Sequence, residues 1–141
     1  MGFRLGSQEL ANEFLRLQDE NAETQAKLKG LSIRLIMLGL DAPGNEDKQL
    51  AIDIENGRFI DIQVQTKPAP SDLRTAPFDK TKYDARVVAP QQTFIDLISG
   101  KLSLLEALDK VKIEGDIGKL MAQFAGFMAF IEFISTMGIE P

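Results

Sequence analysis

The sequence predicts an α+β fold in which a five-stranded, mostly antiparallel sheet is covered on one face by helices. Apolar and polar residues alternate strictly from 50 to 55 and again from 60 to 65, which indicates two strands. Asn56-Gly57 between them is typical of a hairpin turn. Apolar residues spaced three and four apart indicate helices near both ends. With 141 residues, 44% of them hydrophobic, we expect one domain, 1–141.

The N-terminal segment, 1–30, is predicted to be helical. Ser7 is a suitable N-cap for a helix whose apolar stripe is Leu10, Phe14 and Leu17. A second short helix is expected from Glu23 to Lys29, and it would end at Gly30.

Segment 31–65 is predicted to form a meander of three antiparallel strands with one solvent-exposed face. The first strand runs from Leu31 to Leu40, the second from Leu50 to Glu55, and the third returns after the turn. The residues expected on the buried face of the first and third strands are Ile33, Leu35, Met37, Ile60, Ile62 and Val64.

Segment 66–83 has neither the helical nor the strand spacing of apolar residues, and it contains Pro68, Pro70 and Pro77. It is therefore predicted to be a long irregular loop. Such a loop is either a surface excursion or, alternatively, a flap or a dimer contact.

Segment 84–141 is predicted to add two strands and three helices. The strands are Asp84 to Val88, ended by Pro90, and Lys110 to Glu114. A helix from Gln91 to Ser99 ends at Gly100, a capping box formed by Ser103 and Glu106 begins the next, and Asp116 caps the last.

The last helix, predicted from Ile117 to Ile139, would be about 35 Å long and apolar around most of its circumference. Lys119, Gln123 and Glu132 interrupt it, which argues against a membrane span. It is either a central core helix or a helix that packs one face on the sheet and lines a ligand cavity with another. Gly126 in its middle would allow close packing or a bend.

The composition excludes several classes of function. The chain contains neither Cys nor His, so thiolate chemistry, Cys/His metal sites and a histidine base are absent. A net charge of −5 argues against nucleic-acid binding. Two groups of carboxylates, Asp41 with Glu46 and Asp47 and Asp53 with Glu55 and Asp61, are candidates for catalysis, but a solvated strand face explains the second group. We therefore expect no catalytic residues, no metal and no cofactor.

Short motifs follow one another in the second half of the chain: Asp84 with Val87, then Phe94-Ile95-Asp96-Leu97-Ile98-Ser99-Gly100-Lys101-Leu102, Ala107, and Lys112-Ile113-Glu114-Gly115-Asp116. In this order they resemble the sterol carrier protein type 2 family, and the likeness covers most of the chain. The resemblance implies an apolar tunnel between sheet and helices that binds a lipid. It also implies binding and transfer or presentation of that lipid without catalysis.

The residues expected to line the cavity are apolar and lie in the second half of the chain: Phe94, Leu97, Ile98, Leu105, Leu108, Ile113, Leu120, Met121, Phe124, Phe127, Met128 and Ile131. The chain departs from the family in its Pro-rich segment, in its acidity and in lacking a C-terminal peroxisomal signal. We expect a cytoplasmic, prokaryotic protein whose ligand is a fatty acid or acyl-CoA, an isoprenoid or quinone tail, or a sterol-like lipid. The alternative is an interaction module whose C-terminal helix forms a homodimer or a partner-enzyme interface.

Overall fold

A five-stranded sheet with strand order β4-β3-β2-β5-β6 lies at the centre of the computed structural model, which describes residues 3–4, 7–17, 26, 29–103, 106–107, 109–123, 126, 128–129, 131 and 139–140. The strands are β2 (Ile33–Ala42), β3 (Glu46–Glu55), β4 (Arg58–Pro68), β5 (Ala85–Pro90) and β6 (Lys112–Gly115). Only β2 and β5 run parallel within this sheet, so the predicted mostly antiparallel arrangement is confirmed.

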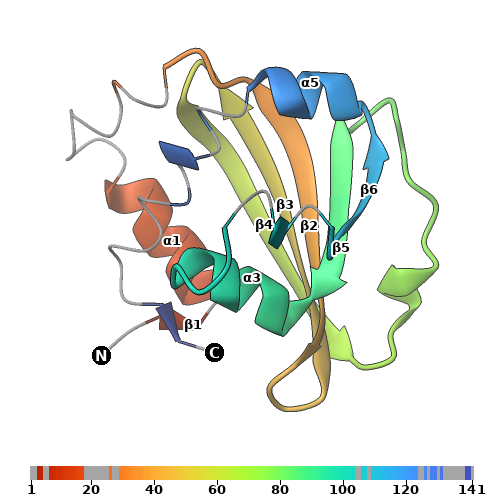
Figure 1. The fold of residues 1–141 in the computed structure, drawn as a ribbon. Coiled ribbons are helices and arrows are strands. Elements are labelled where there is room, and N and C mark those ends of the chain that lie inside the picture. Colours follow the sequence, from red (N-terminus) through yellow and green to blue (C-terminus); the bar gives the residue numbers. More distant parts are fainter. Residues whose placement is uncertain are drawn as a thin grey trace.

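Helices α1 (Gln8–Leu17) and α3 (Gln91–Ile98) lie on one face of the sheet, and α5 (Ile117–Ala122) crosses one end of its strands (Figure 1). We call the face that carries α1 and α3 the inner face. A short parallel pair, β1 (Phe3–Arg4) with β7 (Ile139–Glu140), brings the two ends of the chain together.

The predicted helix caps are present. The Ser7 hydroxyl accepts a hydrogen bond from the Leu10 backbone at 3.1 Å, and the Asp116 carboxylate accepts one from the Lys119 backbone at 2.9 Å. In the capping box, Glu106 N donates to Ser103 Oγ at 3.1 Å and Ser103 N donates to Glu106 Oε1 at 3.2 Å. The short helix predicted from Glu23 to Lys29 lies largely outside the described residues.

The β3–β4 hairpin turns at Asn56 and Gly57, as predicted, with φ of 50° and 80°. Next to the turn, a bulge brings Phe59 opposite Ile54 and shifts the register. Phe59 is therefore buried and packs on Phe14 of α1 with ring centroids 4.4 Å apart. The expectation that Ile60 belongs to the buried face is wrong, because the bulge leaves its side chain 52% exposed.

Two strands are longer than the alternating pattern predicts. β3 begins at Glu46 and β4 continues to Pro68, and these two residues are paired at the end of the ladder. The predicted loop 66–83 is thus wrong for its first three residues. Pro68 is tolerated because β4 is an edge strand, where a missing N–H need not break a ladder bond.

The outer face of the sheet, opposite α1 and α3, is not fully solvent-exposed as expected. Segment 69–84, which includes the 3₁₀ helix η1 (Asp72–Arg74), crosses it, and Leu73 of this segment is buried. Ile36 and Leu38 alternate onto the same face of β2 and are buried as well. The Pro-rich segment therefore acts as a second covering layer.

The C-terminal region is not one helix from Ile117 to Ile139. Helix α5 ends at Ala122, where Gln123 departs from helical geometry with φ −107° and ψ 23°, and Ile139 belongs to β7. Gly126 serves close packing, since a Cβ there would lie 3.0 Å from Leu31 Cβ. Within the described part of the chain, no helix is both long and apolar enough to cross a bilayer.

Candidate functional site

The inner face is built from cross-strand rows of apolar side chains whose register the ladder sets. Near the β3–β4 turn, the row Ile33, Ile54 and Phe59 is at most 2% exposed. In the next row, Leu35 and Ile52 are likewise buried. These rows pack against α1 and α3 and form the closed part of the core.

The next row of inner-face side chains, one step farther from the β3–β4 turn, remains accessible. It runs across all five strands in register, and we call it the apolar row: Val64, Leu50, Met37, Val87 and Ile113. All five side chains are only half-buried, although they point to the side of the sheet that the helices cover. Apolar surface left accessible on the inner face is surface that an apolar ligand would cover.

Buried residues flank the apolar row on its far side too. There Lys48 on β3 is paired with Gly39 on β2, which in turn is paired with Ala89 on β5. Lys48 is 7% and Ala89 2% exposed. Gly39 leaves room for Gln91 at the start of α3, since a Cβ there would lie 1.8 Å from Gln91 Oε1. The apolar row is therefore an accessible strip between two closed rows, and Lys48 and Gln91 lie in the layer that flanks one side of it.

Asp84 links β2 to α5 at the end of the sheet that α5 crosses. Its carboxylate accepts hydrogen bonds from the Arg34 backbone at 2.8 Å and pairs with Lys119 of α5 at 3.1 Å. Burial raises the pKa of Asp84, but these partners outweigh it and hold the pKa below its ordinary value. The ionised carboxylate therefore joins β2 to the helix that closes this end.

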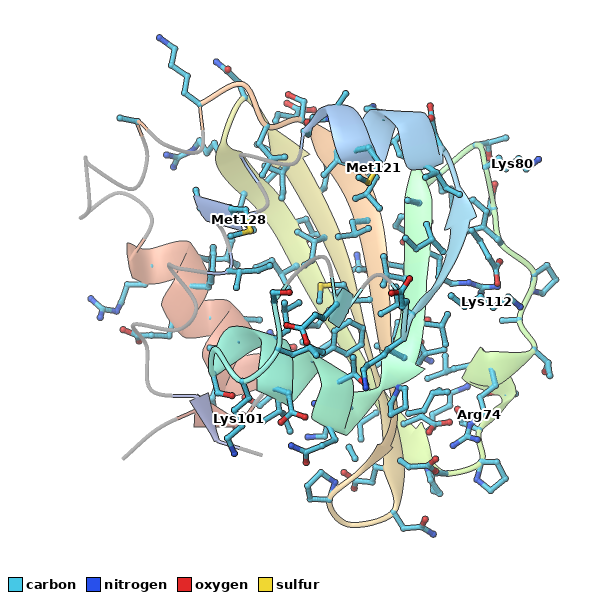
Figure 2. The ribbon with its side chains drawn as sticks, viewed as in Figure 1. Arg74, Lys80, Lys101, Lys112, Met121 and Met128 are labelled. Atoms are coloured by element: carbon cyan, nitrogen blue, oxygen red, sulfur yellow. The ribbon has the colours of Figure 1, made fainter. Side chains whose placement is uncertain are left out.

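The structure places the predicted cavity residues in three kinds of environment. Phe94, Ile98 and Leu120 are buried in the core, whereas Leu97, Ile113 and Ile131 are half-buried. Met121 on α5 and Met128 occupy separate positions (Figure 2) and are 41% and 37% exposed. Leu105, Leu108, Phe124 and Phe127 lie outside the residues whose side chains the structure describes. Of the predicted set, Ile113 belongs to the apolar row.

Sequence reasoning missed the other members of the apolar row. Alternation placed Met37 and Val64 on the correct face but could not tell a buried row from an accessible one. Counting registers from the Asn56-Gly57 turn would have aligned Leu50 with both of them. Nothing in the local sequence marks this row as accessible, because its exposure depends on where α3 and α5 lie.

Two members of the first carboxylate group, Asp41 and Asp47, form ion pairs with Arg74. Asp47 is fully buried and receives both Nε and Nη2 of Arg74 at 2.8 Å. Ser71 and the Asp41 backbone donate to it as well. In the portion of the chain that the structure describes, no three acidic side chains gather into a metal-binding group.

The fold resembles solved structures at low sequence identity. A conserved hypothetical protein of Thermus thermophilus, described as a candidate sterol carrier protein, aligns with a TM-score of 0.73, 14% identity, and coverage of 99% of this chain and 94% of that one. Sterol carrier protein 2 aligns with a TM-score of 0.65, 15% identity, and coverage of 95% and 97%.

A curated relative matches over part of the chain. Trigger factor of Rhodopseudomonas palustris (strain HaA2) is 34% identical over 84 residues, which are 60% of this chain and 18% of that protein. Because the match spans so little of the relative, it transfers no activity to this chain.

The sheet with helices on one face aligns over nearly its whole length with both of these structures, so the chain shares their fold. The model of the SCP-2 sterol transfer family matches residues 11–127. The chain belongs to that family.

Proposed function

We propose that the protein binds a long apolar lipid over the apolar row and transfers or presents it without a catalytic step. The observation that carries the proposal is the half-burial of five aligned apolar side chains between two closed rows. Burial of a methylene group contributes about 0.8 kcal/mol, so covering this row would provide the main favourable term for an acyl chain, against the cost of association. Family membership supports the same role.

Fatty acids, acyl-CoA and isoprenoid or quinone tails are the ligands we favour over sterols. Lys48 and Gln91 belong to the buried layer that flanks the row on one side. Cytoplasmic location belongs to the same proposal and is tested by cell fractionation.

Mass spectrometry of lipid extracted from natively purified protein tests the proposal most directly. We expect a co-purifying lipid with a long acyl or isoprenoid chain, and saturable uptake of a fluorescent fatty acid by the delipidated protein. A protein that carries no lipid and also takes up no fluorescent fatty acid would contradict the proposal.

Adjacent valines on β5 provide a matched pair of variants. Val87 belongs to the apolar row, and Val88 alternates to the outer face. Val87→Thr adds a hydroxyl to the ligand-facing surface at nearly constant volume, and should weaken fatty-acid binding by about tenfold, the effect of about 1.4 kcal/mol of lost apolar contact. Val88→Thr should bind as the unmodified protein does. Equal affinities for the two variants, measured by fluorescence titration, would place the ligand elsewhere.

The alternative, an interaction module, has its own support. Ile117 and Met121 are one helical turn apart on α5 and are 49% and 41% exposed, and Met128 is exposed as well. A homodimer or a partner enzyme would cover these side chains.

Light scattering distinguishes the two functions. If the lipid proposal holds, the protein is a monomer at micromolar concentration and Met121→Gln leaves its mass unchanged. A dimer that dissociates on Met121→Gln, together with undiminished fatty-acid uptake, would show that both functions coexist. A dimer without any lipid uptake would favour the interaction module.

A further inference from the structure

The outer face of the sheet carries a hollow of about 340 Å³ where segment 69–84 rejoins β5. It is separated from the apolar row by the thickness of the sheet, and most of the residues that line it are polar. The residues that line it are Arg34, Ala51, Ile52, Asp53, Asp61, Gln63, Thr81, Lys82 and Tyr83. Its volume lies at the lower end of the range for small-molecule sites, about 300–1,000 Å³.

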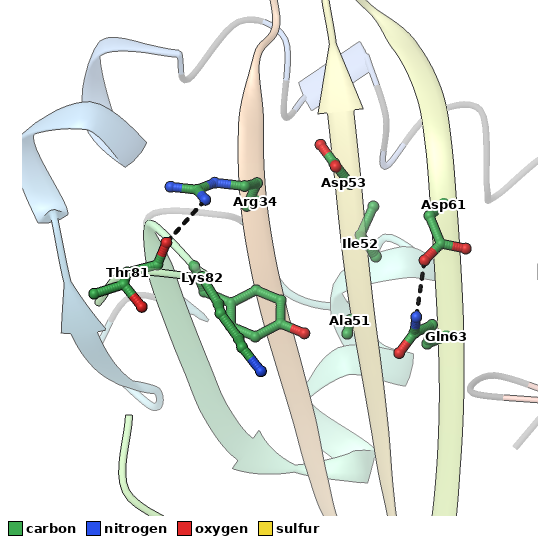
Figure 3. Close-up of a pocket in the computed structure, with 9 residues that line it drawn as sticks. Arg34, Ala51, Ile52, Asp53, Asp61, Gln63, Thr81 and Lys82 are labelled. Carbon is green, nitrogen blue, oxygen red and sulfur yellow. Dashed lines mark hydrogen bonds between the residues drawn. The ribbon is translucent and has the colours of Figure 1, made fainter. Parts of the chain in front are cut away.

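Charges of opposite sign occupy opposite sides of this hollow. Arg34 and Lys82 lie on the side of the covering segment, whereas Asp53 and Asp61 lie on the side of β3 and β4 (Figure 3). Arg34 and Asp53 are direct cross-strand partners, a position in which opposite charges normally pair. Arg34 instead turns away, and its guanidinium donates to the Thr81 carbonyl at 3.2 Å and lies 3.5 Å from Asp84.

Two aspartates lie side by side on the β3–β4 side of the hollow. Asp53 and Asp61 are Cα partners across β3 and β4, an arrangement that costs stability when both are ionised. Asp61 accepts a hydrogen bond from Gln63 at 3.0 Å, and no cation lies within ion-pair distance of either carboxylate in the described part of the chain. A cation between them would offset the repulsion.

Two polar groups that line the hollow have no partner in the described part of the chain. Among the residues that the structure describes, the side chains of Asp53 and Tyr83 take part in no hydrogen bond or ion pair, whereas the exposed Lys82 interacts electrostatically with Asp79. Asp53 and Tyr83 are half-buried, so they have lost part of their hydration without gaining a partner. The hollow thus offers an acceptor on one side and an ammonium and a phenol on the other.

We propose that this hollow binds a small zwitterion, an amino acid or an amino acid-like molecule. Its ammonium group would lie between Asp53 and Asp61, and its acidic group would face Lys82 and Arg34. The Tyr83 hydroxyl would donate to the same acidic group. A ligand that carries one charge alone would satisfy one side and leave the other repelled or unpaired. The site is independent of the lipid surface because it lies on the opposite face of the sheet.

The experiment is an NMR titration of the ¹⁵N-labelled full chain with 4-aminobutyrate, with butylamine and butyrate as singly charged comparisons. We expect saturable shifts confined to the amides of β3, β4 and residues 81–83, with a dissociation constant in the millimolar range. Butylamine and butyrate should each bind about tenfold more weakly or worse, since each loses one charge-assisted contact. Added salt should weaken the binding of 4-aminobutyrate.

Matched variants locate the site. Asp53→Asn and Lys82→Gln should each weaken 4-aminobutyrate binding by about tenfold. Glu55→Gln, an exposed carboxylate on the same strand but outside the hollow, should leave it unchanged. Dispersed spectra and unaltered fatty-acid uptake would show that the variants fold. No saturable shift with any of the three probes, equal binding of butylamine and 4-aminobutyrate, or equal losses in Asp53→Asn and Glu55→Gln would each overturn the proposal.

Discussion

Asp47→Ala is expected to lower the free energy of unfolding by about 3 kcal/mol, the low end of the range for breaking a buried ion pair. Asp47 is fully buried and accepts two hydrogen bonds from Arg74, two from Ser71 and one from the Asp41 backbone. Without the carboxylate these donors lose their acceptor, and the covering segment 69–84 loses its attachment to β3. The loss is at the low end because Arg74 keeps its ion pair with Asp41.

Asp47→Asn, measured in the same experiment, removes the negative charge but keeps the shape of the side chain. Every partner of Asp47 is a donor, so an amide nitrogen in this position would face donors and find no acceptor. We expect the asparagine variant to be destabilised as well. Asp72→Asn is the control, because Asp72 is 76% exposed and an exposed ion pair such as that with Lys67 contributes little to stability. Urea unfolding measures the three stabilities. An Asp72→Asn variant destabilised as much as either Asp47 variant would contradict this account.

The contribution of Asp47 also depends on pH. Hydrogen bonds from Arg74 above all, and then from Ser71, hold the pKa of Asp47 well below its ordinary value of 3.8, although burial acts in the opposite direction. Between the lowered pKa of Asp47 in the folded protein and its ordinary pKa in the unfolded chain, the unfolded chain binds more protons. The free energy of unfolding therefore rises with pH in this range. The difference between the unmodified protein and Asp47→Ala should be complete above about pH 4 and shrink as the pH falls below it. A difference that grows on acidification would refute the assignment.

Gly115→Ala is expected to be similarly damaging, with a loss of about 3 kcal/mol from backbone strain and overlap together. Gly115 has a φ of 97°, a conformation that alanine adopts only with strain. A Cβ there would lie 2.4 Å from the Asp84 carbonyl oxygen and 2.8 Å from the Phe78 ring. The carbonyl cannot move freely, because it also accepts a hydrogen bond from the Asp116 backbone at 2.7 Å.

Gly118→Ala is the matched control for this substitution. Gly118 lies three residues away within α5, where the nearest atom to an added Cβ would be Asp116 Oδ1 at 3.5 Å. Alanine should be tolerated there and stabilise the helix by up to about 1 kcal/mol. Thermal unfolding should therefore move in opposite directions for the two variants. If Gly115→Ala does not lower the Tm relative to Gly118→Ala, strain at Gly115 is not important for stability.

Much of the fold could be predicted from short stretches of sequence. Asn56-Gly57 accepts the two positive φ angles that its turn requires, and the turn follows. Ser7, Ser103 and Asp116 cap their helices through side chains that reach backbone N–H groups three residues ahead. These interactions depend on near neighbours in the chain, which is why the sequence reveals them.

The errors have a common origin in contacts between distant residues. Asp47 is a polar residue near a turn, and Ser71 and Arg74, 24 and 27 positions away, make its burial possible. Ile60 follows the alternating pattern but is exposed because Phe59 packs on Phe14 across the domain. The C-terminal helix is interrupted at Gln123 although its apolar stripe continues. The Gln123 side chain accepts a hydrogen bond from the Ser32 backbone, 91 positions away.

By itself, the sequence determined the α+β class, the meander, the helix caps and the absence of thiol and imidazole chemistry, because each depends on composition or on residues within one turn of each other. The tertiary structure alone decided which apolar row remains accessible and which carboxylates are neutralised. Exposure and ion pairing are set by what packs above a residue. For Met37 and Leu50, the helical layer decides the exposure. Asp47 is neutralised because Arg74 reaches it, whereas Asp53 is not, because Arg34 bonds to Thr81 instead.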